Sequence, residues 1–365
     1  MENEKIKKLV HKYLRGECSD EEKQILETWY NQQVSKEAIS DEINYQFLEQ
    51  HIWNKLDLEE SKKIRKIKYI PFVAAALALM VSFSAIYTFV VKYNFKSQEI
   101  VIVPGSSAAK LSFSDGTEID LNELTNGERI AIGHVNLYKN KDGELIYKAK
   151  ESKENLFSVL ETPKGGQYQI ELTDGTKAWL NATSSIKFPS NFGKNERLVE
   201  ITGEVYFEVV KDSRRPFKVK TTGQLIEVLG THFNVNAYHD EPNQVTTLLE
   251  GAVKIDAFRK SYLLKPSQQL NLHPNGKVSV SDVLAEEAIA WKNGVFQFSD
   301  ENVSSIMRKL SRWYNVEVVF DERFVDKRLA GSISRYEDVS KVLEMLELTN
   351  TVHFKIEGRR IIVMQ

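Results

Sequence analysis

The sequence contains one long apolar run, residues 70–91 (IPFVAAALALMVSFSAIYTFVV), in which no side chain is charged. At 1.5 Å per residue, a helix of this length would span about 33 Å, which matches a hydrocarbon core of roughly 30 Å. The run begins too far from the N-terminus, and is too long, for a cleaved signal peptide. A buried core helix is the alternative, but such helices are usually shorter. The run therefore predicts a single transmembrane helix.

The charges beside this run predict its orientation. A basic membrane collar at 62–69 precedes it, with Lys or Arg at 62, 63, 65, 66 and 68, whereas only Lys92 and Lys96 follow closely. Because positive residues stay on the cytoplasmic side of a membrane, we expect the N-terminus in the cytoplasm. The chain then divides into a cytoplasmic piece of residues 1–61, one span, and an exported part of residues 92–365.

Composition argues against several classes of function. The 49 basic residues nearly balance the 51 acidic ones, whereas a nucleic-acid binder normally has a basic excess. A single cysteine, Cys18, excludes an intramolecular disulfide and a Cys-rich zinc site. The G-x-S-x-G, H-E-x-x-H, P-loop and G-x-G-x-x-G motifs are all missing. We therefore expect no enzyme activity, no cofactor and no metal.

One group of polar residues comes close to a metal site. His232 and His239 are near each other in sequence, and Asp240 and Glu241 follow directly. Polar residues in a turn are usually solvated, so the pattern favours a surface turn over a metal site.

The cytoplasmic piece is acidic and reads as three helices. Residues 1–61 hold 8 basic and 14 acidic side chains, a local net charge of 8 − 14 = −6. The sequence from Ser19 to Glu22 (SDEE) is a capping box that predicts the start of the second helix. About 60 residues of helix make a thin core, so we expect the apolar stripes of these helices to bind a partner rather than only each other.

The exported part begins with a region that we expect to be all-β, residues 92–283. Short alternating runs are separated by Asp-Gly and Asn-Gly turns, and the stretch at 245–255 reads as one such run. The sequence LSFSDGTEIDLN at 111–122 is echoed by IELTDGTKAWLN at 170–181. Recurrence of one strand-turn-strand unit predicts stacked β coils or a sandwich-like fold.

The last segment, residues 291–365, predicts a small α+β domain with the order βαββαββ. Ser299 or Asp300 can cap its first helix, and the second helix is expected at 338–348. The chain as a whole is thus predicted to be multidomain, with an all-α head, one transmembrane helix, an all-β module and a C-terminal α+β domain.

Several motifs in the exported part resemble the FecR family. They are TPKGGQY at 162–168, LTDGT at 172–176, WLNA at 179–182, GEVYFEV at 203–209, RPF at 215–217, VLGTHFNV at 228–235 and LEGAV at 249–253. The motifs stand in the order of the family, within a core at 160–257. The C-terminal segment is similar to the last domain of the Bacteroidota branch, itself like the short N-terminal domains of secretins and TonB-dependent transducers.

The resemblance implies a transmembrane anti-sigma factor of the inner membrane with a periplasmic C-terminus. Such proteins control an extracytoplasmic-function sigma factor when an outer-membrane TonB-dependent transducer signals to the periplasmic domain. The resemblance also implies that the cytoplasmic helices bind the sigma factor. The apolar residues expected at that surface are Leu9, Leu14, Ile25, Trp29, Ile43 and Phe47.

One bond invites a second hypothesis. In some members of the family the Gly-Thr bond of this motif breaks spontaneously, and Gly230 and Thr231 match that pair. A glycine that bends the backbone and a β-branched residue in a strand explain the same two residues without cleavage, and this interpretation is favoured.

Two other functions remain open at the level of sequence. A membrane-anchored periplasmic glycan-binding or structural envelope protein would need only the anchor and a β-rich exported part. A periplasmic enzyme acting on glycosides would need a pair of carboxylates, but 51 acidic residues make such pairs inevitable.

Overall fold

The computed structural model describes residues 101–150 and 156–365, together with residues 5, 8–9, 12, 17–25 and 28 near the N-terminus. The chain divides into two units, Met1–Phe89 and Val90–Gln365. The predicted collar at 62–69 and the predicted span at 70–91 lie outside the described residues. Within the described ranges, no helix combines the length and the apolar character needed to cross a membrane.

The described residues of the first unit include the predicted capping box. Residues 20–25 are helical. The backbone N–H of Ser19 donates to Glu22 Oε2 at 3.0 Å, and the backbone N–H of Glu22 donates to Ser19 Oγ at 3.3 Å. Lys12 Nζ also donates to Glu22 Oε1, at 2.7 Å. The capping box is therefore confirmed, and Glu22 holds the preceding segment as well.

The second unit begins with nineteen strands and no α-helix between residues 106 and 282 of its described part. The first ten are β1 (Ser106–Ser107), β2 (Lys110–Phe113), β3 (Glu118–Asp120), β4 (Arg129–Ile132), β5 (Val135–Lys139), β6 (Leu145–Ala149), β7 (Phe157–Glu161), β8 (Gly166–Glu171), β9 (Lys177–Leu180) and β10 (Ser185–Pro189). The others are β11 (Arg197–Glu208), β12 (Phe217–Lys220), β13 (Leu225–Val228), β14 (His232–Ala237), β15 (Gln244–Glu250), β16 (Val253–Ala257), β17 (Lys260–Leu264), β18 (Gln268–Leu272) and β19 (Val278–Asp282). The expectation of an all-β region is confirmed.

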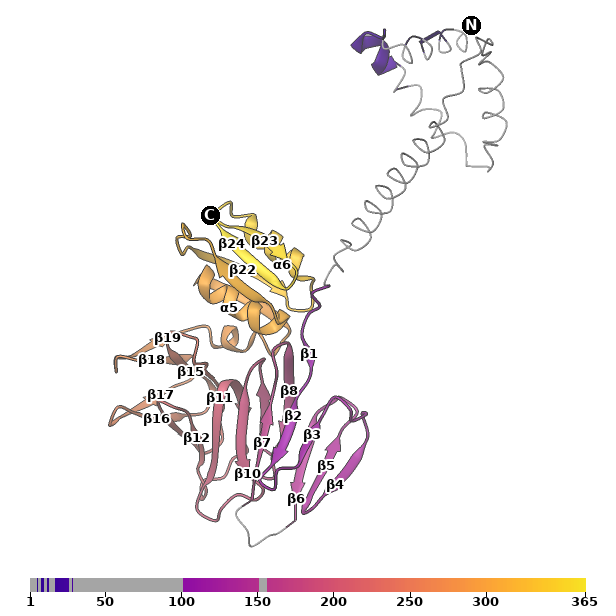
Figure 1. The fold of residues 1–365 in the computed structure, drawn as a ribbon. Helices are drawn as coiled ribbons and strands as arrows, with labels where there is room; N and C mark the ends of the chain where they lie inside the picture. Colours follow the sequence, from indigo (N-terminus) through magenta and orange to yellow (C-terminus); the bar gives the residue numbers. More distant parts are fainter. Residues whose placement is uncertain are drawn as a thin grey trace, which may run out of the picture. The chain divides into compact units, whose positions relative to one another are not determined.

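Eighteen of these strands form two sheets that share the long strand β11, and β1 pairs in parallel with β8. In one sheet the order is β3-β2-β7-β10-β11-β12-β13-β16-β17, and in the other it is β4-β5-β6-β8-β9-β11-β14-β15-β18-β19. Strand β11 changes sheet at Gly203, which has a φ of +75° and no room for a side chain, since a Cβ there would lie 2.4 Å from Ser184 Oγ. From β12 onward the chain places one hairpin in each sheet in turn (Figure 1).

The core of this sandwich lies between the two sheets. Every second residue of the central strands is buried, as in β8, where Tyr168 and Ile170 point inward. Phe207 of β11 stacks on Phe233 of β14 with ring centroids 5.3 Å apart. The two echoed segments form equivalent hairpins, β2-β3 and β8-β9, but they lie in opposite sheets.

One predicted strand was wrong in its extent. The run at 245–255 is split, because β15 ends at Glu250 and β16 begins at Val253. Gly251, with a φ of +94°, allows the chain to turn between them and to enter the other sheet.

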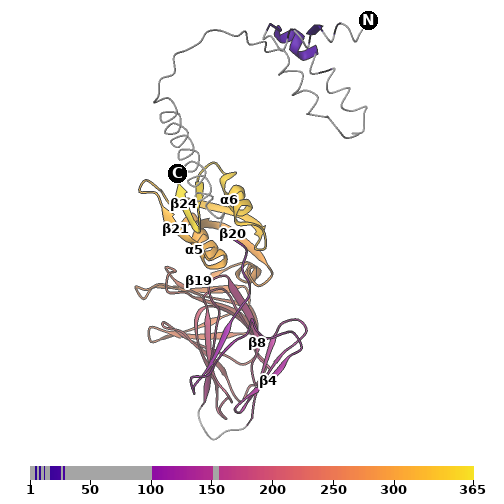
Figure 2. The ribbon, with the colours of Figure 1, turned by 45° about the vertical axis from the view of Figure 1, so that its right-hand side comes forward.

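A short 3₁₀ helix, Ala285–Ile289, leads from β19 to a C-terminal module with the predicted βαββαββ order. The elements are β20 (Val295–Asn302), α5 (Val303–Tyr314), β21 (Glu317–Phe320), β22 (Arg328–Ser334), α6 (Val339–Glu347), β23 (His353–Glu357) and β24 (Arg360–Met364). Strand β20 pairs with β22, and β24 lies between β21 and β23. Helix α5 faces the sandwich in both views (Figures 1 and 2).

The start of α5 differs from the prediction. Strand β20 continues past Ser299 and Asp300 through a bulge, and its last residue, Asn302, pairs with Arg328 and is also the N-cap. The Asp326 carboxylate accepts from the backbone N–H of Ser304 at 3.1 Å and so caps the helix from another segment. The second helix, expected at 338–348, is α6, and Asp338 is its N-cap, since the carboxylate accepts from the backbone N–H of Ser340 at 2.8 Å.

Candidate functional site

The guanidinium of Arg335 links the C-terminal module to the sandwich. Its Nη2 donates to Asn181 Oδ1 at 2.8 Å, and its Nη1 donates to the carbonyl of Trp291 at 2.8 Å. Asn181 in turn donates from Nδ2 to Glu204 Oε2 at 2.8 Å, while Glu204 Oε1 accepts from Asn234 Nδ2 at 3.0 Å. An amide therefore bridges the cation of one module to a carboxylate of the other.

Arg335 is only 2% exposed. Its guanidinium lies 3.8 Å from the centroid of the Trp313 ring, a cation–π contact. Burial lowers the pKa of Arg335 to about 10, so the side chain stays charged at neutral pH. Among the described residues, no carboxylate forms an ion pair with it, and its Nε has no hydrogen-bond partner. Loss of any hydrogen bond to a buried cation is costly, because the charge is then left uncompensated. The docking of the C-terminal module therefore depends on the few contacts of Arg335.

A second link joins an acidic turn of the sandwich to helix α5. Asp240 and Glu241 follow β14, and both bind Arg312, with Nη1 to Asp240 Oδ2 at 2.8 Å and Nη2 to a Glu241 oxygen. Glu241 also accepts from Arg308, one helical turn earlier, at 2.7 and 2.9 Å. The Arg312 guanidinium lies 4.0 Å above the Tyr238 ring. Such charge-assisted, partly buried pairs are stronger than exposed ones.

This turn contains part of the polar group that sequence analysis considered as a metal site. Asp240 and Glu241 are occupied by arginines, and His232 Nδ1 lies 3.2 Å from Glu250 Oε2. In the portion that the structure describes, no group of three His, Cys, Asp or Glu side chains could hold a metal ion.

The glycines of the 162–168 motif allow a third, backbone contact. The N–H of Gly165 donates to the carbonyl of Arg312 at 2.7 Å, at the end of α5. Gly165 has a φ of +74°, and Gly105 beside it has no room for a Cβ, which would lie 2.5 Å from the Trp313 ring. Tyr238 donates to the carbonyl of Ala182 at 2.6 Å. Gly165 of the 162–168 motif thus contributes to the docking of the C-terminal module.

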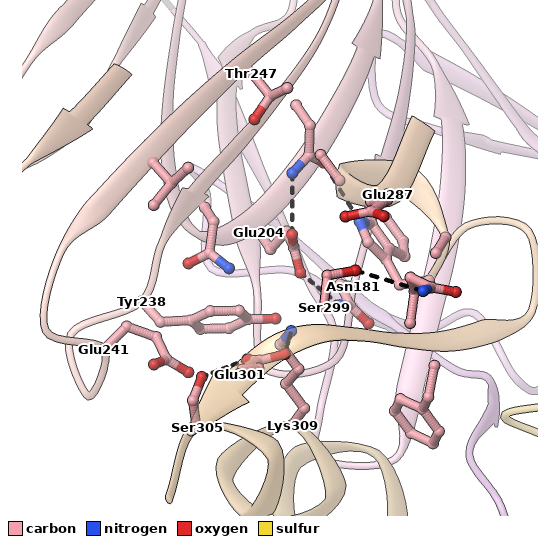
Figure 3. A pocket seen from close by; sticks show the side chains of 18 of the residues that line it. Asn181, Glu204, Tyr238, Glu241, Thr247, Glu287, Ser299, Glu301, Ser305 and Lys309 are labelled. Carbon is pink, nitrogen blue, oxygen red and sulfur yellow. Dashed lines mark hydrogen bonds and ion pairs between the residues drawn. The ribbon is translucent and has the colours of Figure 1, made fainter. Parts of the chain in front are cut away.

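Between these links the two modules enclose a cleft of about 580 Å³. Its floor is the outer face of β11, β14, β15 and β18, and its other wall comes from the 3₁₀ segment, β20 and α5. Figure 3 shows Thr247 of the floor on one side of this cleft, with Ser305 and Lys309 of α5 on the other. The cleft is lined by residues of the sandwich, the 3₁₀ segment and the C-terminal module, and the sequence did not predict it.

The Gly230–Thr231 bond lies at the entry to β14, away from this cleft. A Cβ on Gly230 would lie 2.8 Å from Lys211 Cα, so the close backbone approach explains the glycine. Thr231 is 3% exposed, and its hydroxyl donates to the carbonyl of Ala252 at 3.1 Å. Cleavage of this bond stays a hypothesis, and the favoured interpretation without cleavage stays a prediction.

Most of the predicted sigma-binding residues lie outside the described residues: Leu14, Trp29, Ile43 and Phe47. Of the two that are described, Leu9 is half-buried and Ile25 is 55% exposed. Their role stays a prediction.

Comparisons with known proteins bear on the same regions. The family profile described as FecR protein matches residues 158–254, and the profile described as FecR, C-terminal, matches residues 295–363. No curated protein matches the chain.

Two solved structures, each described as a candidate anti-sigma factor from Parabacteroides distasonis ATCC 8503, are similar to it. The first is 30% identical, with a TM-score of 0.54, over 56% of this chain and 97% of the other. The second is 29% identical, with a TM-score of 0.55, over 57% of this chain and 99% of the other.

Proposed function

The chain belongs to the FecR family of anti-sigma factors, and on that premise we propose that it is a single-span inner-membrane regulator of an extracytoplasmic-function sigma factor. The observation that carries the topology is the uncharged run at 70–91 behind its basic collar. The run separates an acidic N-terminal piece from a β-rich part that carries both family matches. The N-terminus is then cytoplasmic and the C-terminus periplasmic.

The cytoplasmic helices act by occlusion. A piece with a net charge of 8 − 14 = −6 complements the basic surfaces by which a sigma factor meets DNA, and its apolar stripes cover the surfaces that meet polymerase. Deletion of residues 1–61 followed by transcript profiling tests this role. We expect a defined set of transcripts to change, and unchanged transcripts would favour an envelope protein that is merely anchored by its helices.

The periplasmic signal enters through the C-terminal module from a TonB-dependent outer-membrane transducer. Strands β21 and β23 are the outer strands of a three-stranded sheet, and each pairs only with β24 in the described structure. Unpaired strand edges can accept a strand from a partner. The N–H groups of Glu317 and Asp321 face β24, so that of Phe320 between them faces the free edge of β21. Replacement of Phe320 by proline would block such pairing and should abolish induction if that edge is used, with the same change at Ile356 testing the free edge of β23.

The links between module and sandwich provide a path for that signal. Arg335, Arg312 and Gly165 hold the two parts by side-chain, ionic and backbone contacts. A partner that moves the C-terminal module must shift or break these contacts. Binding of the transducer to the module would therefore change the conformation of the sandwich through this junction.

A further inference from the structure

The cleft between sandwich and C-terminal module leaves a defined set of polar groups free for a ligand. Almost all charged side chains of the lining are already satisfied: Lys309 pairs with Glu301, Arg328 with Asp300, and Glu204 accepts from two amides. No described residue forms a hydrogen bond with the side chains of Asn236, Asn243, Asn271 or Glu287, and Gln269 uses only its oxygen. The free groups therefore include the amides of Asn236, Asn243 and Asn271, the amino group of Gln269 and the carboxylate of Glu287, with the amide of Asn302 on the wall formed by the C-terminal module.

These amides lie in register across the floor of the cleft. Asn236 in β14 is opposite Val245, which is opposite Asn271 in β18, and Gln269 lies two residues along the same strand. With strands about 4.8 Å apart and a rise of about 3.4 Å per residue, the array measures roughly 10 Å by 7 Å. A flat array of this size suits the face of one or two sugar rings.

Two side chains of the lining each contain a buried atom without a hydrogen-bond partner. Arg335 is 2% exposed and lines the cleft, and its Nε has no acceptor. Asn236 Oδ1 has no donor. Both atoms are shielded from solvent, so the groups open to a ligand are the free amides and the carboxylate named above.

The same geometry disfavours an extended polypeptide. Each floor strand already has a neighbour on both sides: β14 pairs with β11 and β15, β15 with β14 and β18, and β18 with β15 and β19. No backbone edge is free in the floor for strand addition. An anionic ligand would meet the free carboxylate of Glu287, and a cationic one would find no second free carboxylate.

We propose that this cleft binds a neutral oligosaccharide, with Asn236, Asn271 and Gln269 bonded to its hydroxyls and Glu287 accepting from one of them. The ligand is held by the sandwich floor and the 3₁₀ segment, beside the C-terminal module. This binding goes beyond the regulation of a sigma factor and does not depend on it, because co-purification with the sigma factor and binding of a sugar are measured separately.

The test uses the full chain, purified in a detergent without a sugar headgroup, with maltotriose, cellotriose, mannotriose and laminaritriose as probes. We expect at least one trisaccharide to bind in calorimetry and to raise the unfolding temperature. Asn271→Ala and Glu287→Gln should each weaken that binding about tenfold, since the first removes an amide that bonds the sugar and the second replaces a charged acceptor by a neutral one. Asn136→Ala, which removes an exposed amide of β5 outside the cleft, should not weaken it.

Two results would overturn the proposal. One is that none of the four sugars binds at a concentration of about 10 mM, where even a weak site is filled. The other is that a sugar binds wild type and both cleft variants equally, which places it elsewhere. Unfolding of each variant without sugar shows whether its fold is intact, and Glu287→Gln preserves the shape of an exposed residue.

Discussion

Asn181 and Arg335 are 154 positions apart in sequence, and the amide oxygen of the first accepts from the guanidinium of the second at 2.8 Å. The same amide donates to Glu204, so both ends of Asn181 are used. The positive charge of Arg335 and the negative charge of Glu204 are thus linked through the Asn181 amide. The two charges balance each other without a direct ion pair. The docking of the two parts is thus tied to one amide of the 179–182 motif.

Asn181→Ala should loosen this junction. The change leaves one N–H of Arg335 and one oxygen of Glu204 without their partner, at a cost of about 1–3 kcal/mol. Hydrogen exchange should become faster at the amide of Gly165, which donates to Arg312 across the junction. Asn136→Ala is the matched control. Equal protection of Gly165 in Asn181→Ala and wild type would contradict the role given to this amide.

Arg312→Ala should destabilise the exported part by about 3 kcal/mol, because Glu241 is left 9% exposed with only Arg308 as a partner. The control is Lys341→Ala, which removes an exposed pair with Glu337 and should cost less than about 1 kcal/mol. Chemical unfolding of both variants measures the difference. Equal losses would show that the acidic turn contributes no more than a surface ion pair.

The local elements were predictable because their causes are local. The capping box of Ser19 and Glu22 and the helices and strands of the βαββαββ order each depend on residues within a few positions of each other. The errors were local too: Gly251 stood inside an alternating pattern that hid a turn, and β20 continued past two good capping residues through a bulge.

The junction could not be predicted, because it depends on pairs distant in sequence. Arg308 and Arg312 stand one helical turn apart, and this spacing could have indicated a shared acidic partner. Nothing local selects Asp240 and Glu241 from 51 acidic residues, however. The amides of the cleft floor could not be predicted either, because polar residues are expected on the outer face of any strand. They line a cleft only because the C-terminal module docks above them.

Gly105→Ala should separate the module from the sandwich more directly. A Cβ at this position would lie 2.5 Å from the Trp313 ring and 2.7 Å from the carbonyl of Gly165, so the backbone must shift, at a cost of about 1–3 kcal/mol. Gly193→Ala is the control, because its nearest neighbour would lie 3.5 Å away. Limited proteolysis should cut the segment before β20 faster in Gly105→Ala than in either wild type or control. Identical cleavage rates would show that Trp313 can move aside freely.

Thr231→Val tests the meaning of the Gly230–Thr231 pair. The Thr231 hydroxyl donates to the carbonyl of Ala252, so we expect its loss to cost about 1 kcal/mol of stability, while an immunoblot of wild-type cells shows one full-length band. Thr231→Ser keeps the hydroxyl and should be close to wild type. A shorter fragment present in wild type and Thr231→Ser but missing in Thr231→Val would instead establish cleavage at this bond.

Trp29→Ala combined with Phe47→Ala should abolish co-purification of the sigma factor. Both residues belong to the predicted apolar stripes of the cytoplasmic piece, and large aromatic side chains dominate the energy of most protein interfaces. Lys8→Ala combined with Glu21→Ala changes two exposed residues of the same piece and should leave binding intact. The measurement is recovery of the sigma factor with the tagged full chain from cells. Undiminished recovery with the aromatic variant would place the sigma-binding surface elsewhere in the chain, and loss with the control pair alone would indicate that charge rather than apolar contact holds the partner.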